Sequence, residues 1–242
     1  MLRSLAKRLL AHAPVALTQN MRYDRQTRAI IERALAPTSN CLDVGCHRGE
    51  VLDWMLARAP LGEHVGFEPI PALAQALELK YAAEPAVRIS RLALSDEAGA
   101  ADFNYVTSNP SYSGLRRRSY DRPGERDERI TVERARLDDA VPAGTPIALV
   151  KIDVEGGELA VLRGARRLLA EQRPVVVFEF GLGAADHYGA TPGEVYAVLA
   201  EAGLDVRTLD GHLKRTAPLT RTEFGRLYRD RAEYYFAASA RG

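Results

Sequence analysis

Acidic residues and glycines follow several short apolar runs of this sequence, at the places where buried strands would end. A carboxylate there is poorly placed for a core, but it can accept hydrogen bonds from a ligand or take a proton from a reacting group. Parallel strands bring their carboxyl ends to one edge of a sheet, which is where ligands bind in such folds. The pattern therefore predicts one site built from successive strand ends: Asp43 to Gly49, Glu68, Ser95 with Asp96, Asp153 to Gly157, and Glu179.

The first of these strand ends is the stretch CLDVGCHRGE, residues 41–50, in which Gly45 and Gly49 bracket a turn. Glycines let a backbone approach a ligand closely, and Glu68 follows at the spacing at which an acid accepts hydrogen bonds from ribose hydroxyls. The turn lacks the third glycine of a dinucleotide cradle, so a nucleoside ligand without a diphosphate fits better than NAD. Cys46 and His47 lack the further ligands that a metal site needs.

Strands and helices must alternate along the chain to bring these residues together. Apolar runs predict strands at residues 41–44, 64–69, 87–94, 147–154 and 175–180, and apolar–polar alternation predicts strands at 101–107 and 130–134, with late strands at 204–209 and 232–239. Helical periodicity with start signals predicts helices at residues 24–35, 50–58, 71–81, 158–171 and 191–202. This order is typical of an α/β domain with a mostly parallel sheet covered by helices on both faces.

The bulk composition fits a single globular domain. The chain has 242 residues, of which 46% are hydrophobic, and a formal net charge of +1, which gives no reason to expect nucleic acid as a partner. Its two cysteines fit a reducing, cytoplasmic setting, and no apolar run reaches the ~18 residues that a membrane span requires. We expect one domain over residues 23–242; the oligomeric state has no signature in the sequence.

Residues 1–22 form a basic and apolar N-terminal extension, in which Leu2, Leu5 and Leu9 recur at helical spacing. The pattern predicts a short amphipathic helix. Packing on the rest of the domain is the expected role, and peripheral contact with a membrane surface is the alternative.

A polar segment, residues 108–129, is rich in arginine and in acidic residues and contains several turn signals. A solvated loop of mixed charge explains this composition. A mobile cover over a substrate cleft explains it as well.

Five stretches, LDVGCHRGE, GFEP, RLALSDEAG, PVVVFEF and above all LVKIDVEGGELAVLRGA, resemble the FkbM family of S-adenosylmethionine-dependent methyltransferases. The resemblance extends over about residues 30–236. It implies a class I methyltransferase fold, a Rossmann-like seven-stranded sheet whose last strand is antiparallel. It also implies transfer of a methyl group to a hydroxyl of a sugar, a glycan or a secondary metabolite.

The same resemblance implies roles for individual residues. Asp153 and Glu155 would lie where the methyl acceptor approaches. The cofactor-binding residues fall into three groups: Asp43, Gly45 and Gly49 at the methionine end, Glu68 at the ribose hydroxyls, and Ser95 and Asp96 on the adenine side.

A sugar hydroxyl is a poor nucleophile while it keeps its proton, so we expect a general base. Asp153, at the end of its strand, is the first candidate, and His187, in the loop GLGAADHYG, is the second. No metal ligands are assigned. An alternative to the base is Mg²⁺ held by Asp153, Glu179 and Asp186, which would acidify a bound hydroxyl.

Two rival functions share the same pattern. An NAD(P)-dependent oxidoreductase would use the same sheet and the acid after the second strand, but its third glycine is missing. The second rival function is that of a catalytically inactive, methyltransferase-like scaffold that binds a partner. It stays open because fold alone does not establish function.

Overall fold

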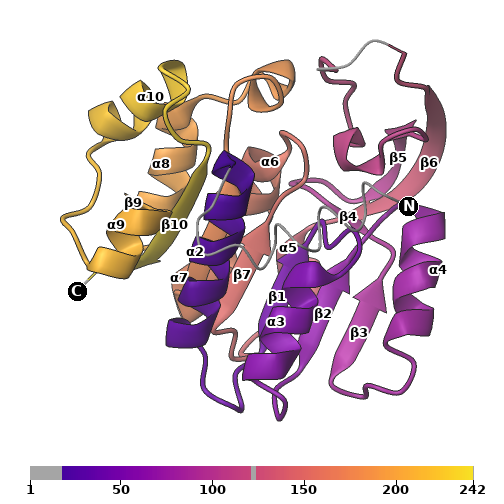
Figure 1. The fold of residues 1–242 in the computed structure, drawn as a ribbon, viewed down its shortest axis with the longest axis horizontal. Coiled ribbons are helices and arrows are strands. Elements are labelled where there is room, and N and C mark those ends of the chain that lie inside the picture. The colour runs from indigo at the N-terminus through magenta and orange to yellow at the C-terminus, as the bar shows by residue number, and fades with distance from the viewer. Residues whose placement is uncertain (1–17, 121–123, 242) are drawn as a thin grey trace.

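The computed structural model describes residues 18–120 and 124–241 (Figure 1). The predicted N-terminal extension therefore lies outside the described residues as far as residue 17. Its last residues belong to a long helix, α2 (Gln19–Ala34), whose N-cap is Thr18. Among the described residues, no helix is both long and apolar enough to cross a membrane.

The main sheet has seven strands in the order β3 (Val87–Ser90), β2 (His64–Phe67), β1 (Cys41–Val44), β7 (Leu149–Ile152), β8 (Val175–Glu179), β10 (Tyr235–Ala240) and β9 (Leu204–Thr208). β10 runs antiparallel to both of its neighbours, whereas β1, β2, β3, β7 and β8 are parallel. The seven-stranded, mostly parallel sheet expected from the sequence is confirmed. Its last strand in the chain is the antiparallel one.

Helices cover both faces of this sheet because side chains alternate along each strand. Leu42 and Val44 point into a core formed with α5 (Leu137–Ala140), α6 (Glu158–Arg163), α7 (Arg166–Gln172), α8 (Pro192–Glu201) and α10 (Arg221–Arg229). Cys41 belongs to the opposite core, formed with α2, α3 (Glu50–Arg58), α4 (Pro71–Lys80) and α9 (Leu209–Lys214). In Figure 1, α2 and α3 lie across the front of the sheet.

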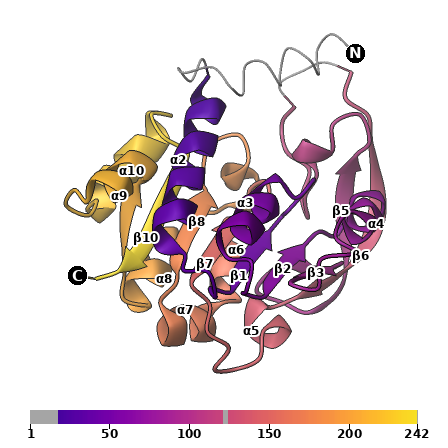
Figure 2. The same cartoon turned by 60° about the horizontal axis from the view of Figure 1, so that its bottom comes forward.

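A second, three-stranded sheet in the order β4 (Ala93–Leu94), β6 (Asp127–Ala135) and β5 (Gly99–Val106) packs beside the start of α4 (Figure 2). The single strand predicted at residues 87–94 is wrong, because it divides between the two sheets. β3 stays in the main sheet, whereas Ala93 is buried against Phe103 of β5 and Val132 of β6.

The helix predicted at residues 158–171 is also two helices, α6 and α7. The break falls at Gly164, where a Cβ would lie only 2.0 Å from the carbonyl oxygen of Ser95. The close approach of another loop therefore requires glycine at this position.

Candidate active site

A cavity of about 230 Å³ lies at the carboxyl edge of the parallel strands. The loops after β1, β2 and β7 line it, together with α2 and the start of the 108–129 segment. Four of the predicted site residues are in its wall: Asp43, Gly45, Glu68 and Asp153. Four others, Gly49, Ser95, Asp96 and His187, are not.

Gly45 begins the turn after β1 with a φ of +77°, in the left-handed region that favours glycine. A Cβ at this position would lie 1.9 Å from the carbonyl oxygen of Asp153. Gly45 lines the cavity, and the absence of a side chain allows the backbone of the loop after β7 to approach closely. A role in clearing room for a cofactor stays a prediction.

Gly49 ends the same turn as the N-cap of α3, with a φ of +74°. A Cβ there would lie 2.5 Å from the hydroxyl of Tyr81, which donates a hydrogen bond of 2.9 Å to the Gly49 carbonyl. Packing against the end of α4 therefore accounts for this glycine. A role in holding a cofactor stays a prediction.

Asp43 is 1% exposed in the middle of the parallel sheet, and neither carboxylate oxygen makes a hydrogen bond of normal geometry to the described residues. Burial raises the pKa of its carboxyl to about 6, although the ammonium of Lys151, directly opposite on β7, opposes the shift. Buried carboxylates normally have partners. Asp43 is therefore a free acceptor in the wall of the cavity.

Glu68, at the end of β2, is 4% exposed and accepts hydrogen bonds from the backbone N–H groups of His47 (2.9 Å) and Ile70 (3.0 Å). These bonds fix the carboxylate beside the turn after β1. Burial raises its pKa to about 7. Each oxygen keeps a lone pair that could accept from a ligand.

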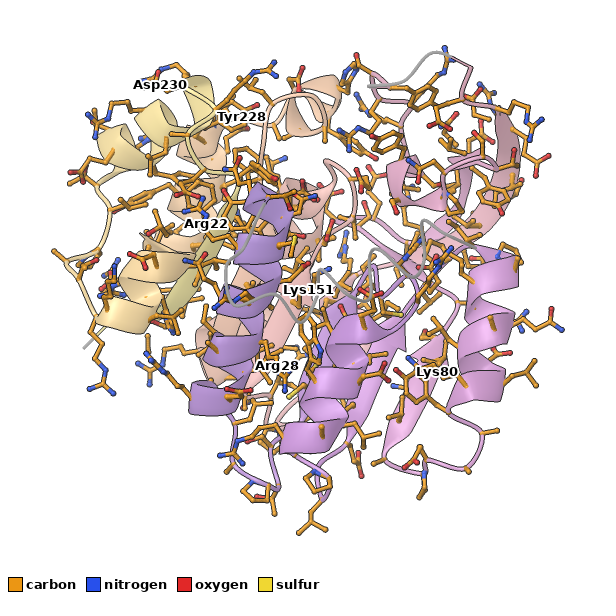
Figure 3. The ribbon with its side chains drawn as sticks, in the orientation of Figure 1. Arg22, Arg28, Lys80, Lys151, Tyr228 and Asp230 are labelled. Atoms are coloured by element: carbon orange, nitrogen blue, oxygen red, sulfur yellow. The ribbon has the colours of Figure 1, made fainter. Side chains whose placement is uncertain are left out.

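Asp153 follows β7, and its Oδ2 accepts hydrogen bonds from Lys151 Nζ (2.9 Å) and from the hydroxyl of Tyr235. Lys151 lies at the centre of the fold, unlike the labelled Lys80 on the outer helix α4 (Figure 3). Burial would raise the pKa of Asp153, but Lys151, Glu179 and Tyr235 outweigh it and bring the pKa to about 2. Asp153 is therefore ionised at neutral pH.

The loop after Asp153 is held by an acid that the sequence reasoning did not single out. Glu158 is 1% exposed, and its Oε1 accepts from the backbone N–H groups of Val154 (3.0 Å) and Gly156 (3.1 Å). Glu155, which lies between Val154 and Gly156, has a left-handed φ of +58° and forms an ion pair with Arg118. The two interactions fix the backbone that carries Asp153 into the cavity.

Ser95 and Asp96 line a second cavity, which shares Leu115, Gly157 and Tyr188 with the wall of the first. His187 accepts from the backbone N–H of Ser119 through Nε2, at 3.2 Å. The neighbouring Tyr188, not His187, is in the cavity wall. The adenine-side role of Ser95 and Asp96 and the role of His187 as a second base stay predictions.

The acidic group that could hold a cation differs from the predicted one. Ligand atoms of Asp153, Glu155 and Glu179 lie within 4.8 Å of one another, whereas Asp186 accepts from the backbone N–H of Gly183 at 2.6 Å. Lys151 and Arg118 already supply positive charge to this group. The donors thus fit Mg²⁺ poorly, and we derive no step through a metal.

The segment at residues 108–129 has two parts. Its first part lines the cavity through Pro110, Ser111, Ser113 and Leu115. Further on, Arg117 pairs with Asp127 on the surface. The first part therefore contacts the cavity and Arg117 lies on the surface, while a mobile cover stays a prediction.

Among the wall residues that the sequence did not indicate, two approach from distant parts of the chain. Tyr235 begins β10, and Thr27 lies on α2. The sequence shows only the alternation of a strand and the period of a helix at these places. Neither pattern says which residue faces a site that other segments build.

Comparisons with known proteins agree with this architecture. The family model described as the methyltransferase FkbM domain matches residues 43–206. No curated protein sequence matches the chain.

Two solved structures share the fold at low sequence identity. One is the methyltransferase FkbM from Methylobacillus flagellatus KT, with a TM-score of 0.52 and 14% identity over 85% of this chain; the chain spans 44% of that protein's length. The other is geranyl diphosphate methyltransferase in complex with S-adenosylmethionine, with a TM-score of 0.50 and 15% identity over 97% of this chain and 95% of that one.

Proposed function

Because the chain belongs to the methyltransferase FkbM domain family, we propose that it uses S-adenosylmethionine to methylate a hydroxyl oxygen of a sugar, a glycan or a secondary metabolite. The observation that carries the choice of cofactor is the Asp43 carboxylate, buried in the cavity wall with no hydrogen bond of normal geometry to the described residues. An ammonium group can donate a hydrogen bond to such an anion and a sulfonium group attracts it electrostatically, and the methionine end of the cofactor has both. When bound, the cofactor supplies an activated methyl group.

Glu68 would hold the ribose hydroxyls. Its carboxylate is fixed by two backbone N–H groups at the end of β2, which is where an acid meets a ribose in sheets of this type. Glu68 and Asp43 both line the cavity that reaches Asp153. Cofactor and acceptor sites would thus share one space.

Asp153 would accept the hydrogen bond of the reacting hydroxyl and take its proton as the new bond forms. Its low pKa keeps it ionised at neutral pH, which suits it to orient the hydroxyl but makes it a weaker base than an ordinary carboxylate. Alignment of two reacting groups can lower a barrier by about 7–11 kcal/mol, and a positioned base adds roughly 10²–10⁴-fold. Asp153 would contribute to both effects.

The charge of the cavity wall favours an uncharged acceptor. Carboxylates outnumber cations there: the acids are Asp24, Asp43, Glu50, Glu68, Asp153 and Glu155, and the bases are Arg48 and Lys151. Two arginines of the 108–129 segment have partners of their own, Arg117 with Asp127 and Arg129 with Asp102. An anionic acceptor would meet repulsion that a neutral hydroxyl compound avoids.

Calorimetry with S-adenosylhomocysteine and with NAD, measured separately, tests the proposal. We expect saturable heat with S-adenosylhomocysteine and none with NAD. Binding of NAD alone would favour the oxidoreductase. Binding of S-adenosylhomocysteine without methyl transfer to any neutral glycoside or polyol tested would favour the inactive scaffold.

A further inference from the structure

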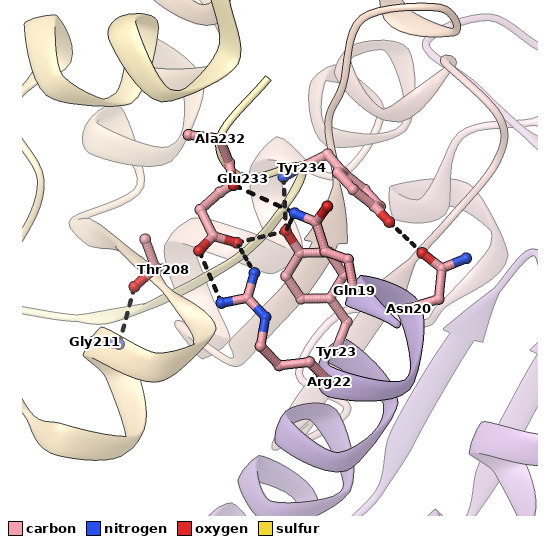
Figure 4. Close-up of polar contacts among 9 residues, drawn as sticks. All are labelled: Gln19, Asn20, Arg22, Tyr23, Thr208, Gly211, Ala232, Glu233 and Tyr234. Atoms are coloured by element: carbon pink, nitrogen blue, oxygen red, sulfur yellow. Dashed lines mark hydrogen bonds and ion pairs between the residues drawn. The ribbon is translucent and has the colours of Figure 1, made fainter. Parts of the chain in front are cut away.

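The start of α2 is joined to the loop before β10 by a compact polar cluster (Figure 4). The guanidinium of Arg22 donates to both carboxylate oxygens of Glu233, at 3.1 and 2.8 Å. The hydroxyl of Tyr23 donates to the same carboxylate. A bidentate pair with a further donor fixes Glu233 in position and orientation.

Tyr23 is the centre of this cluster. It is 2% exposed, and its hydroxyl oxygen accepts from Gln19 Nε2 (2.7 Å) and from the backbone N–H of Tyr234 (3.2 Å). The hydroxyl is therefore fully used as donor and acceptor. Because one of its bonds goes to the backbone, it fixes the path of the chain where β10 begins.

The next residue along that chain reaches the candidate active site. The ring of Tyr235 lies 5.1 Å from that of Tyr23, centroid to centroid, and its hydroxyl donates to Oδ2 of Asp153. In the sheet Tyr235 is paired with Glu179, the last residue of β8. One side of the ring thus contacts α2 while its hydroxyl holds the carboxylate at the end of β7.

We propose that Tyr235 is a positioning residue for the Asp153 carboxylate, and that Tyr23 and Glu233 hold Tyr235 in the place from which it does so. The inference rests on the proposed function, since it assumes that Asp153 receives the acceptor hydroxyl. Tyr235 and Lys151 donate to the same oxygen, which restricts rotation of the carboxylate. Helix α2 would then contribute to catalysis without contacting the reacting atoms.

Other charges also act on Asp153 and must be held constant in any test. They come from each neighbouring element: Lys151 on β7, Asp43 on β1, Glu179 on β8, Glu155 and Glu158 in the loop and helix that follow β7, and His47 in the turn after β1. Removing only the hydroxyl of Tyr235 leaves all of these in place. A change in the titration of Asp153 then reports the lost donor.

A matched control stands beside Tyr235 in the chain. The hydroxyl of Tyr234 donates to Asn20, so it also joins this loop to α2, but it does not bond to Asp153. If the cluster only holds α2 against the loop before β10, Tyr234→Phe and Tyr235→Phe should have similar effects on the titration of Asp153 and on turnover. If it positions Asp153, the two variants should differ.

The experiment follows the ¹³C carboxyl signal of Asp153 by NMR from pH 8 down to about pH 1.5, or to the acid limit of folding, with S-adenosylhomocysteine present, because the wild-type pKa is about 2. We expect Tyr235→Phe to move the Asp153 titration upward, because a hydrogen bond to the charged form lowers a pKa. Tyr23→Phe and Glu233→Gln should move it in the same direction by less, and Tyr234→Phe should leave it unchanged. Turnover of Tyr235→Phe should fall roughly 10- to 100-fold with unchanged affinity for S-adenosylhomocysteine.

An unmoved titration in Tyr235→Phe, or an equal shift in Tyr234→Phe, would overturn the proposal. The NMR measurement needs no methyl acceptor, so it remains informative if the proposed function fails. A wild-type protein that binds S-adenosylhomocysteine but methylates nothing would remove the catalytic role and leave the titration result standing.

Discussion

The Cα of Gly45 packs directly against the carbonyl group of Asp153. A Cβ on Gly45 would lie 1.9 Å from that oxygen, far inside any contact distance. Gly45 directly follows β1 in the DVG stretch, and Asp153 directly follows β7 in the KID stretch. The two most informative parts of the sequence are therefore one packed unit.

Gly45→Ala should destabilise the protein by about 3 kcal/mol or more, because it combines a backbone clash with a left-handed φ. Gly144→Ala is the matched control: its φ of +76° is nearly the same, but no atom lies within 4 Å of its Cβ position. It should cost about 1 kcal/mol. Urea unfolding of both variants measures the difference, and equal losses would show that the loops after β1 and β7 can separate.

Glu68→Gln should weaken binding of S-adenosylhomocysteine by roughly 10- to 100-fold, since a neutral amide is a poorer acceptor for ribose hydroxyls than a carboxylate. Glu63→Gln, an exposed change just before the same strand, should have no effect. Calorimetry at pH 8 provides both affinities. Unchanged affinity in Glu68→Gln would contradict the ribose assignment.

The sequence predicted the sheet better than the site. Continuous apolar runs such as 147–154 and 175–180 identify buried parallel strands almost unaided. Alternation at 101–107 and 130–134 also predicted strands, but it could not say that they form a sheet of their own. Sheet membership depends on long-range pairing, such as that of Phe103 with Ile130.

In the site, the sequence identified the acids but not their partners. Asp153 was a candidate from its place after an apolar run, whereas Tyr235, which bonds to it, lies in a distant stretch with only a strand pattern. For the glycines, the sequence indicates that some group approaches the backbone closely, but not which group. Only the fold reveals whether that group is a ligand, as expected, or another part of the chain.

The unfolding free energy should fall as pH rises from about 5 to 8. Burial raises the pKa of Asp43 to about 6, of Glu68 to about 7 and of Glu158 to about 7, above the ordinary values of 3.8 and 4.5. These three carboxyls therefore bind more protons in the folded state than in the unfolded state in this range, and each destabilises by up to ~1.4 kcal/mol per pH unit. Burial lowers the pKa of His47, His64 and His212, which acts in the opposite sense, and we expect the carboxyls to dominate. Asp153 also acts in the opposite sense, but only below pH 4.

Urea unfolding at several pH values measures this slope, and Glu158→Gln should make it shallower. The amide oxygen can still accept from Val154 and Gly156, which both bond to Oε1, while the titrating group is gone. A slope of the opposite sign in the wild type would mean that these carboxyls are ionised in the folded protein.

Chelation with EDTA should change neither the melting temperature nor the rate of methyl transfer. Lys151 and Tyr235 occupy the Oδ2 of Asp153, and Arg118 pairs with Glu155, so the acidic group already has its positive charge. Thermal unfolding and a transfer assay with and without EDTA test this. If EDTA abolished activity and added Mg²⁺ restored it, this prediction would be contradicted and the Mg²⁺ alternative would be favoured.

Asp153→Asn should abolish most turnover and spare cofactor binding. The amide oxygen can still accept from Lys151 and Tyr235, so the fold and the cavity should persist, but the group can no longer take a proton. We expect a loss of about 10²–10⁴-fold in turnover.

Asp153→Ala is a weaker test, because it leaves Lys151 buried without its partner, which costs about 3–5 kcal/mol of stability. Calorimetry with S-adenosylhomocysteine measures cofactor binding, and a transfer assay measures turnover. Weaker binding with normal turnover in Asp153→Asn would mean that Asp153 contacts the cofactor and not the acceptor.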